Sequence, residues 1–200
     1  NVAVANPETD VIVSGGIDVY PATEIAISGT TTVVDPNLTQ FAFHWRLDNG
    51  SETTASSATS GVENTALSAL QIGTARRIRL GIANQGSTTT APSTYQLEYG
   101  TPAPTCADIT TWEVVNNAGA VWNLSNTANL TDGNNTTNIS AATGGLTDII
   151  GTTFVGANGG VRDQNNTTGS VSLNIDNFIE VEYSVVASTT AVEGETYCFR

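Results

Sequence analysis

An alternation of apolar and polar side chains recurs along this chain and limits the fold more than any other feature of the sequence. The first such stretch is QFAFHWRL at residues 40–47, and RRIRLGIAN at 76–84 and FIEVEYSVV at 178–186 repeat the pattern. A strand with one face against a core and the other toward solvent has this period. Ser, Thr and Gly are abundant between the stretches and favour strands joined by tight loops. The sequence therefore predicts an all-β protein.

The charge of the chain argues against one large class of partner. The formal net charge is −13, and the densest basic cluster consists of Arg76, Arg77 and Arg79. An acidic surface repels phosphate backbones, so we expect no nucleic-acid partner. No apolar run approaches the roughly 18 residues that cross a bilayer, so we expect no membrane insertion. A chain that begins at Asn1 and contains no Met is expected to be a processed protein that has lost a targeting segment, with a cloned fragment as the alternative. The acidic charge suits a protein outside a cell, so we expect an extracellular, cell-surface location.

Two parts of the chain match each other in order and in pattern. When they are aligned, Ile78 meets Val181 and Leu80 meets Tyr183, and after one gap TYQLEYG at 94–100 meets TYCFR at 196–200. Repeated units of this kind are typical of tandem β-sandwich modules.

The match predicts two tandem immunoglobulin-like β-sandwich domains, at residues 10–101 and 102–200. Their boundary falls in GTPAPT at residues 100–105, where two prolines stiffen a short linker. Residues 1–9 are left over and are a candidate N-terminal donor strand.

Several segments resemble a known group of proteins. TARRIRLGIANQG at 74–86, GLTDIIGTTFVGANGGVRDQ at 145–164 and FIEVEYSVVASTTAVEGETYCFR at 178–200 are the most specific. They look like repeat units of very large secreted surface proteins from uncultured, candidate-phylum (Parcubacteria-like) bacteria. The resemblance implies extracellular, β-rich modules and carries no catalytic or binding residues over to this chain.

Cys106 and Cys198 lie near the two ends of the second predicted domain. In a chain with an extracellular character, two cysteines most simply form one disulfide, which here joins the start of that domain to its end. Free thiols and a link to a neighbouring subunit are the alternatives. A metal site would need more ligands than a chain with one His offers.

Opposite charges fall at matched positions of the two predicted domains. Arg77 and Arg79 align with Glu180 and Glu182, and each pair is expected on the outward face of its strand. In a head-to-tail assembly, the basic face of one subunit would meet the acidic face of the next, so these four residues are predicted subunit contacts. Scattered surface charges are the alternative.

The titratable residues do not form a recognised catalytic pattern. His44 is the only His and is expected to lie exposed on a strand, and no nucleophile-elbow sequence accompanies it. Glu180 and Glu182 could serve glycoside hydrolysis, but two carboxylates on one outward face are more often a solvated edge. We therefore predict that the protein is not an enzyme.

Oxygen-rich loops raise the question of Ca²⁺ at Asp48–Gly50, Asp132–Asn134 and Asp163–Asn165. None has the length of a recognised calcium loop, so we interpret them as ordinary Asx turns and predict no cofactor, with Ca²⁺ as the alternative. Glycans are further candidate partners, because Asn-x-Ser/Thr recurs along the chain. Trp112 and Trp122 are candidates either for the core or for exposed glycan contacts.

The N-terminal NVAVAN suits a strand donated to a neighbour. Val2 and Val4 alternate with small residues, and Pro7 ends the pattern. We therefore predict a structural subunit of an extracellular filament or surface assembly, which polymerises with copies of itself by exchanging β-strands. The alternatives are an adhesin or carbohydrate-binding stalk module of a larger surface protein, and a viral fibre or capsid protein.

Overall fold

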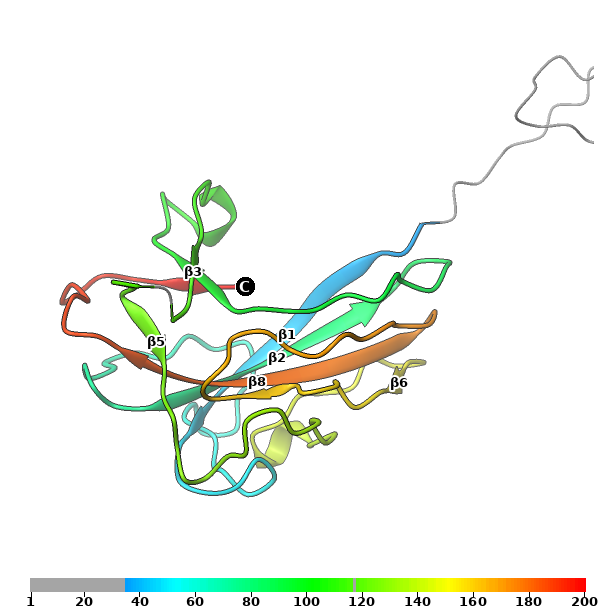
Figure 1. Ribbon diagram of the computed structural model, residues 1–200, viewed down its shortest axis with the longest axis horizontal. Helices are drawn as coiled ribbons and strands as arrows, with labels where there is room; N and C mark the ends of the chain where they lie inside the picture. Colours follow the sequence, from blue (N-terminus) through cyan, green and yellow to red (C-terminus); the bar gives the residue numbers. More distant parts are fainter. Residues whose placement is uncertain (1–34, 117) are drawn as a thin grey trace, which may run out of the picture. The chain divides into compact units, whose positions relative to one another are not determined.

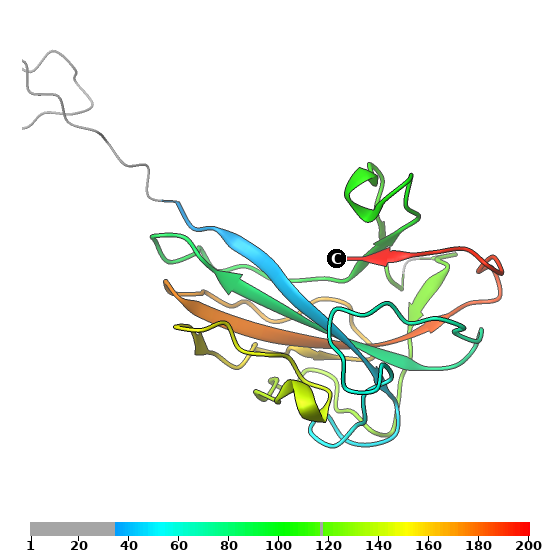
Figure 2. The same ribbon diagram turned by 180° about the vertical axis from the view of Figure 1, so that it is seen from behind.

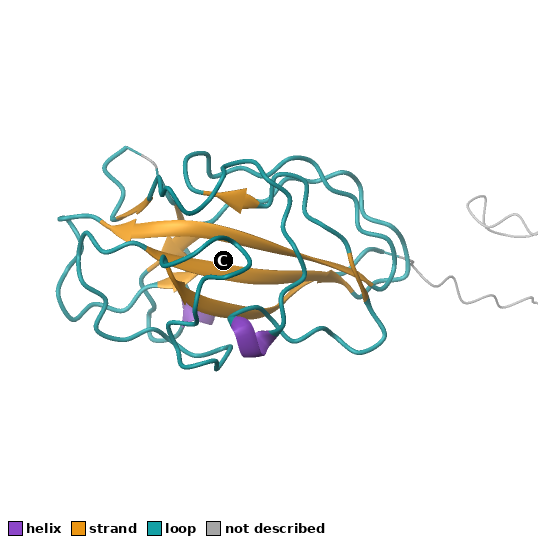
Figure 3. Ribbon diagram, turned by 90° about the horizontal axis from the view of Figure 1, so that it is seen from below, coloured by secondary structure: helices purple, strands orange, loops and turns teal. Residues whose placement is uncertain are grey.

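The described residues form strands and loops with two short helical turns, so the prediction of an all-β protein is confirmed (Figure 3). The computed structural model describes residues 35–116 and 118–200. Over these ranges, helical geometry is confined to two 3-10 turns, η1 (Cys106–Asp108) and η2 (Ala141–Thr143). Neither turn, nor any other described segment, is an apolar helix long enough to cross a membrane.

The larger of two sheets is built on three long strands, β1 (Leu38–Leu47), β2 (Arg76–Asn84) and β8 (Asn177–Ala187). They lie in the order β1, β2, β8, and both pairings are antiparallel (Figure 1). Three short strands pair with β8 as well: β5 (Trp122–Leu124) antiparallel, and β6 (Thr153–Phe154) and β7 (Val161–Arg162) parallel. The sheet is therefore organised around β2 and β8.

A smaller sheet covers one face of the larger one. It consists of β3 (Glu98–Gly100), β4 (Glu113–Val114) and β9 (Cys198–Phe199) in the order β4, β3, β9. The two layers meet in an apolar core, where the Trp122 ring lies 4.9 Å from that of Phe199 and 5.7 Å from that of Tyr197. This arrangement is sandwich-like.

Loops cover the other face of the large sheet. Figures 1 and 2 both show the segments at about residues 48–65 and 135–150 alongside β1, β2 and β8, on the side away from β3 and β9. On this face a bulge in β1 turns Phe41 over Gly81, and the Phe41 ring packs edge-on against Phe178 at 5.7 Å. Both faces of the central strands are therefore covered.

The described residues do not separate into two sandwiches at residues 100–105. The described residues cluster as a single unit, and β2 of the first predicted domain pairs along its length with β8 of the second. The segments that match in sequence are neighbours: Arg79 lies opposite Glu182, and Glu98 exchanges backbone hydrogen bonds with Arg200. Strands that lie side by side in one sheet complete one shared core, so the internal match marks paired strands, not separate domains. Residues 10–34 lie outside the described residues.

Candidate functional site

A cluster of charged side chains lies on the loop-covered face of the large sheet. This charged cluster consists of Arg46, Asp48, Glu52, Arg77, Arg79, Glu180 and Glu182. The side chains of its three arginines and of Glu180 and Glu182 are 0% exposed. They come from three adjacent strands, whose alternation turns every second side chain toward this face.

Arg79 is the centre of the charged cluster. Its Nη1 lies 2.6 Å from Oε2 of Glu182 and 2.8 Å from Oε1 of Glu52, and its Nε donates to Glu180. Arg46 donates to the same Oε2 of Glu182 at 2.5 Å. Burial of charge is costly unless each charge is paired and hydrogen-bonded, and this network supplies the pairing.

The charged cluster has one more carboxyl group than guanidinium groups, and the excess falls on Glu180. Burial raises the pKa of Glu180 to about 7, although Arg79 favours its ionised form. Oε1 of Glu180 is buried and has no hydrogen-bond partner among the described residues. Burial also disfavours the charge of Arg79, but Glu182 and Glu180 outweigh that effect and raise its pKa above the usual value. Arg79 therefore stays charged while Glu180 can take up a proton.

The prediction that Arg77, Arg79, Glu180 and Glu182 form an intersubunit contact is wrong for the folded chain. The predicted attraction is present, but it acts within one molecule. The covering loops close over it, since Arg77 donates to the Gly50 carbonyl at 2.6 Å and Arg79 donates to the carbonyl of Thr137. The interpretation of the two glutamates as a solvated edge fails for the same reason, because loops cover the face that the alternation marks as polar.

His44 is buried as well, contrary to the expectation of an exposed strand histidine. Its Nδ1 donates to the Gly145 carbonyl at 2.7 Å, so its Nε2 accepts from the Ser57 hydroxyl at 2.8 Å. Burial lowers the pKa of His44, which favours this neutral form. The Ser57 oxygen also accepts from the backbone N–H groups of Thr59 and Gly61. The pair therefore joins two loops to the sheet and orders a turn.

Two of the oxygen-rich loops lie together. Oδ1 of Asp132 accepts from the backbone N–H groups of Asp163, Gln164 and Asn165 at 3.0 to 3.3 Å. Burial raises the pKa of Asp132, but these hydrogen bonds outweigh it and hold the pKa below the usual value. Among residues 35–116 and 118–200 no group of acidic, His or Cys side chains could hold a metal ion. The third loop contributes Asp48, which pairs with Arg77 in the charged cluster.

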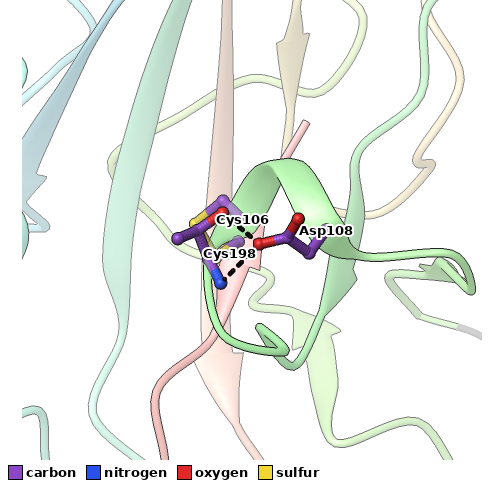
Figure 4. The surroundings of a disulfide bond; sticks show 4 residues. Cys106, Asp108 and Cys198 are labelled. Atoms are coloured by element: carbon purple, nitrogen blue, oxygen red, sulfur yellow. Dashed lines mark hydrogen bonds between the residues drawn. A yellow bond between two sulfur atoms is a disulfide. The ribbon is translucent and has the colours of Figure 1, made fainter.

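The predicted disulfide is present. Cys106 at the start of η1 is bonded to Cys198 in β9, 92 residues later (Figure 4). Next to it, the Asp108 carboxylate accepts from the backbone N–H and the hydroxyl of Thr105 at 3.0 and 2.6 Å. The bond is typical of a chain that folds in an oxidising environment.

The candidate glycan contacts differ in exposure. Trp122 is buried in the core, whereas Trp112 is half-buried with the Arg200 guanidinium 4.4 Å from its ring centre. Of the Asn-x-Ser/Thr sites, Asn166 is buried and hydrogen-bonded through both amide atoms, so it cannot carry a glycan in the folded chain. Seven others are exposed: Asn37, Asn49, Asn129, Asn134, Asn135, Asn138 and Asn165.

An apolar groove opens at the other face of the large sheet, beside the end of β9. We call it the edge groove. It has a volume of about 190 Å³ and lies between Leu38, Leu80, Ile82 and Tyr183 of the large sheet and Tyr95 and Arg200 of the opposite layer. The side chains of Leu38 and Ile82 are not fully covered, and Leu38 is 42% exposed. Sequence reasoning missed this site, because Leu38 and Tyr95 carry no motif that distinguishes them from core residues.

Both layers end in an open strand at the edge groove. β1 is the edge strand of the large sheet, and β9 is the edge strand of the small one. Loop residues hydrogen-bond to the second half of β1, for example Asn64 N–H to the Phe43 carbonyl at 2.8 Å. Among the described residues, only β2 pairs with β1 at Leu38–Gln40. Exposed edges of this kind are templates for another strand.

The predicted contact residues Val2 and Val4 lie outside the described residues.

No protein-family model, curated protein or solved structure that we compared with the chain matches it. The candidate site therefore rests on the geometry of the edge groove and the strand edges beside it.

Proposed function

We propose that the protein is a structural subunit of an extracellular filament or surface assembly, and that copies of it polymerise head to tail by exchanging β-strands. The observation that carries this proposal is the edge groove, which is apolar and lies between two open strand edges. An unpaired edge beside an apolar groove is a liability in a monomer and a joint in a polymer.

The distribution of charge supports this proposal over an enzymatic role. The perturbed titratable groups of the described residues, above all Glu180 and Arg79, are sealed under loops, where no substrate can reach them. The disulfide anchors β9, and the residue that follows β9, Arg200, belongs to the lining of the edge groove. A fixed groove and a covered charged cluster suit a protein whose task is assembly.

The first test is whether the full chain assembles. We expect light scattering and electron microscopy to show concentration-dependent polymers, and a chain lacking residues 1–6 to stay a folded monomer. The described unit holds its core without those residues. Polymers of unchanged stability after the deletion would show that the N-terminal residues are not the exchanged strand.

A glycan-binding module is the second candidate, and one observation favours it. A shallow depression of about 400 Å³ is lined by amide side chains, including Asn116, Gln164 and Asn165. Amides are among the polar groups that fix a ligand's orientation in protein sites. This reading predicts a monomer that binds oligosaccharides on a glycan array and loses that binding in Gln164→Ala.

A further inference from the structure

We infer that the edge groove is the acceptor site for the N-terminal strand of a second copy of this chain, with Val2 and Val4 as the inserted side chains. This inference rests on the proposed function and identifies its joint. The incoming strand pairs with the open edge of β9, and its two valine side chains pack against Leu80 and Ile82.

The chemistry of the edge groove fits an apolar strand. Its lining from the large sheet is mainly aliphatic, and its volume of about 190 Å³ has room for two small branched side chains. Val2 and Val4 are two residues apart, so a strand presents both on one face, and Ala3 and Ala5 on the other face need little space. Pro7 cannot donate to a ladder and would end the pairing.

Two tyrosines in the lining lack partners that a backbone would supply. The hydroxyls of Tyr95 and Tyr183 are buried, and neither has a hydrogen-bond partner among the described residues. Tyr183 is 1% exposed. A buried hydroxyl without a partner is unfavourable, because its lost hydrogen bonds to water are not replaced. An inserted strand brings carbonyl groups that can accept hydrogen bonds beside these tyrosines, whereas an aliphatic small molecule brings none.

The course of the chain before β1 favours a second copy over the chain's own N-terminus. Residues 35–37 continue the line of β1 past Leu38 and are held against the end of β2: Gln85 N–H donates to the Asn37 carbonyl at 2.8 Å, and Ser87 N–H donates to that of Asp35 at 3.3 Å (Figure 1). The chain is thus carried beyond the groove. Residues 7–34 can span at most about 3.3 to 3.6 Å per residue, which is long enough to reach either groove, so it is the direction of residues 35–37 that favours a neighbour.

Cysteine cross-linking tests the occupant directly. Full-length Val4→Cys is mixed with full-length Leu38→Cys and oxidised under mild conditions, and linked peptides are identified by mass spectrometry. We expect a disulfide between residue 4 of one chain and residue 38 of the other. The matched control replaces Leu38→Cys by Val192→Cys, at an apolar position that is 62% exposed and lies outside the groove, and it should give no specific link.

The double variant Val4→Cys/Leu38→Cys separates exchange between copies from insertion within one chain. Exchange produces a ladder of covalent oligomers on a non-reducing gel. A cross-linked species of monomer mass would overturn the inference, because it places the strand in its own groove.

A binding measurement covers the case in which cysteine variants fold poorly. The full-length Val2→Asp/Val4→Asp chain is titrated with synthetic peptides of residues 1–9 and of residues 22–30, the second of which carries Ile25 and Ile27 at the same spacing. We expect the first peptide to bind more tightly. When Leu38→Glu is added to this chain, we expect the dissociation constant of the first peptide to rise at least about tenfold. When Val192→Glu is added in its place, the rise should be less than about twofold. Tighter binding of the second peptide, or equal effects of both substitutions, would contradict the assignment.

Failure of the inference is distinguishable from failure of the proposed function. If the wild-type chain forms polymers but residues 4 and 38 never become linked, the function stands and the joint lies elsewhere. If the wild-type chain remains a monomer at every concentration, the function itself fails.

Discussion

Arg79 and Glu182 face each other across β2 and β8, with Nη1 of the arginine 2.6 Å from Oε2 of the glutamate, and both side chains are fully buried. These two residues also occupy matched positions of the internal repeat. The ion pair therefore joins the two halves of the chain at the middle of their longest ladder.

Removing the charge of Arg79 should strongly destabilise the fold. Arg79→Met leaves Glu180 and Glu182 buried beside each other with less compensation, and we expect a loss of about 3 to 5 kcal/mol in the free energy of unfolding. Urea denaturation followed by tryptophan fluorescence measures it. The control is Arg200→Ala, which removes the exposed pair with Glu98 and should cost about 1 kcal/mol or less. Equal losses in the two variants would contradict the central role of Arg79.

Stability should fall as the pH rises through neutrality. The pKa of Glu180 is about 7 in the folded chain, above its ordinary value of 4.5, so the folded state binds the proton more tightly than the unfolded state. The contribution of Glu180 is therefore complete below about pH 4.5 and is lost as the pH rises through 7, by about 3 kcal/mol. Glu180→Gln should flatten the profile of melting temperature against pH over this window, and the exposed Glu195→Gln should leave the slope in place.

Stability should also fall in acid, through different residues. Burial raises the pKa of Asp48, but hydrogen bonds from Thr127 and Arg77 outweigh it and hold the pKa below its ordinary value of 3.8. A carboxyl group of this kind stabilises the fold above its unfolded pKa, and the contribution is lost as the pH falls through the folded one. The melting temperature should therefore be highest near pH 4 to 5. In Asp48→Asn the melting temperature should decline less steeply as the pH falls below about 4. An unchanged decline would mean that other carboxyl groups cause it.

Opening the disulfide should cost about 4 to 5 kcal/mol. The bond closes a loop of 92 residues, and the loss comes mainly from the greater freedom of the unfolded chain. Cys106→Ser/Cys198→Ser should show this loss in urea denaturation, and reduction of the wild-type protein should reproduce it. A much smaller effect would mean that β9 is held chiefly by its contacts with β3 and the core.

Asn166 should matter more to stability than its neighbour Asn165. Its side chain accepts from Leu97 N–H at 2.9 Å and donates to the carbonyls of Leu97 and Val115 at 2.8 and 2.9 Å, all inside the protein. Asn166→Ala leaves these backbone groups without partners and should cost about 3 kcal/mol. Asn165→Ala, at an exposed position, should cost less than about 1 kcal/mol. Thermal unfolding of the two variants under identical conditions gives the comparison.

The sequence was sufficient to predict the long strands and the disulfide. Residues 40–47, 76–84 and 178–186 carry the two-residue period, and the structure places strands there. Two cysteines in a chain of extracellular character leave few pairings, and the bond between Cys106 and Cys198 is the simplest. Local pattern and cysteine number were enough for these features because neither depends on which strands become neighbours.

Strand neighbours and buried faces could not be predicted. Arg77, Arg79, Glu180 and Glu182 alternate with apolar residues as a solvated face does, and only the covering loops and the charges across the ladder make that face an interior. The internal match was real, but sequence similarity cannot distinguish two strands of separate domains from two strands paired in one sheet. The edge groove forms where the large and small sheets, with β1 and β9 at their edges, no longer cover each other. The position of that point cannot be predicted from the sequence of any single segment.

The pairing of β2 with β8 sets the order in which the chain can fold. Arg79 pairs with Glu182, which lies 103 residues later in the sequence. During synthesis the large sheet therefore stays incomplete until nearly the whole chain has been made. Topologies dominated by such distant contacts fold slowly, because a long loop must close before the contacts repay its entropy. The last long strand to be synthesised, β8, thus brings the carboxylates that pair with Arg46, Arg77 and Arg79 when these arginines become buried.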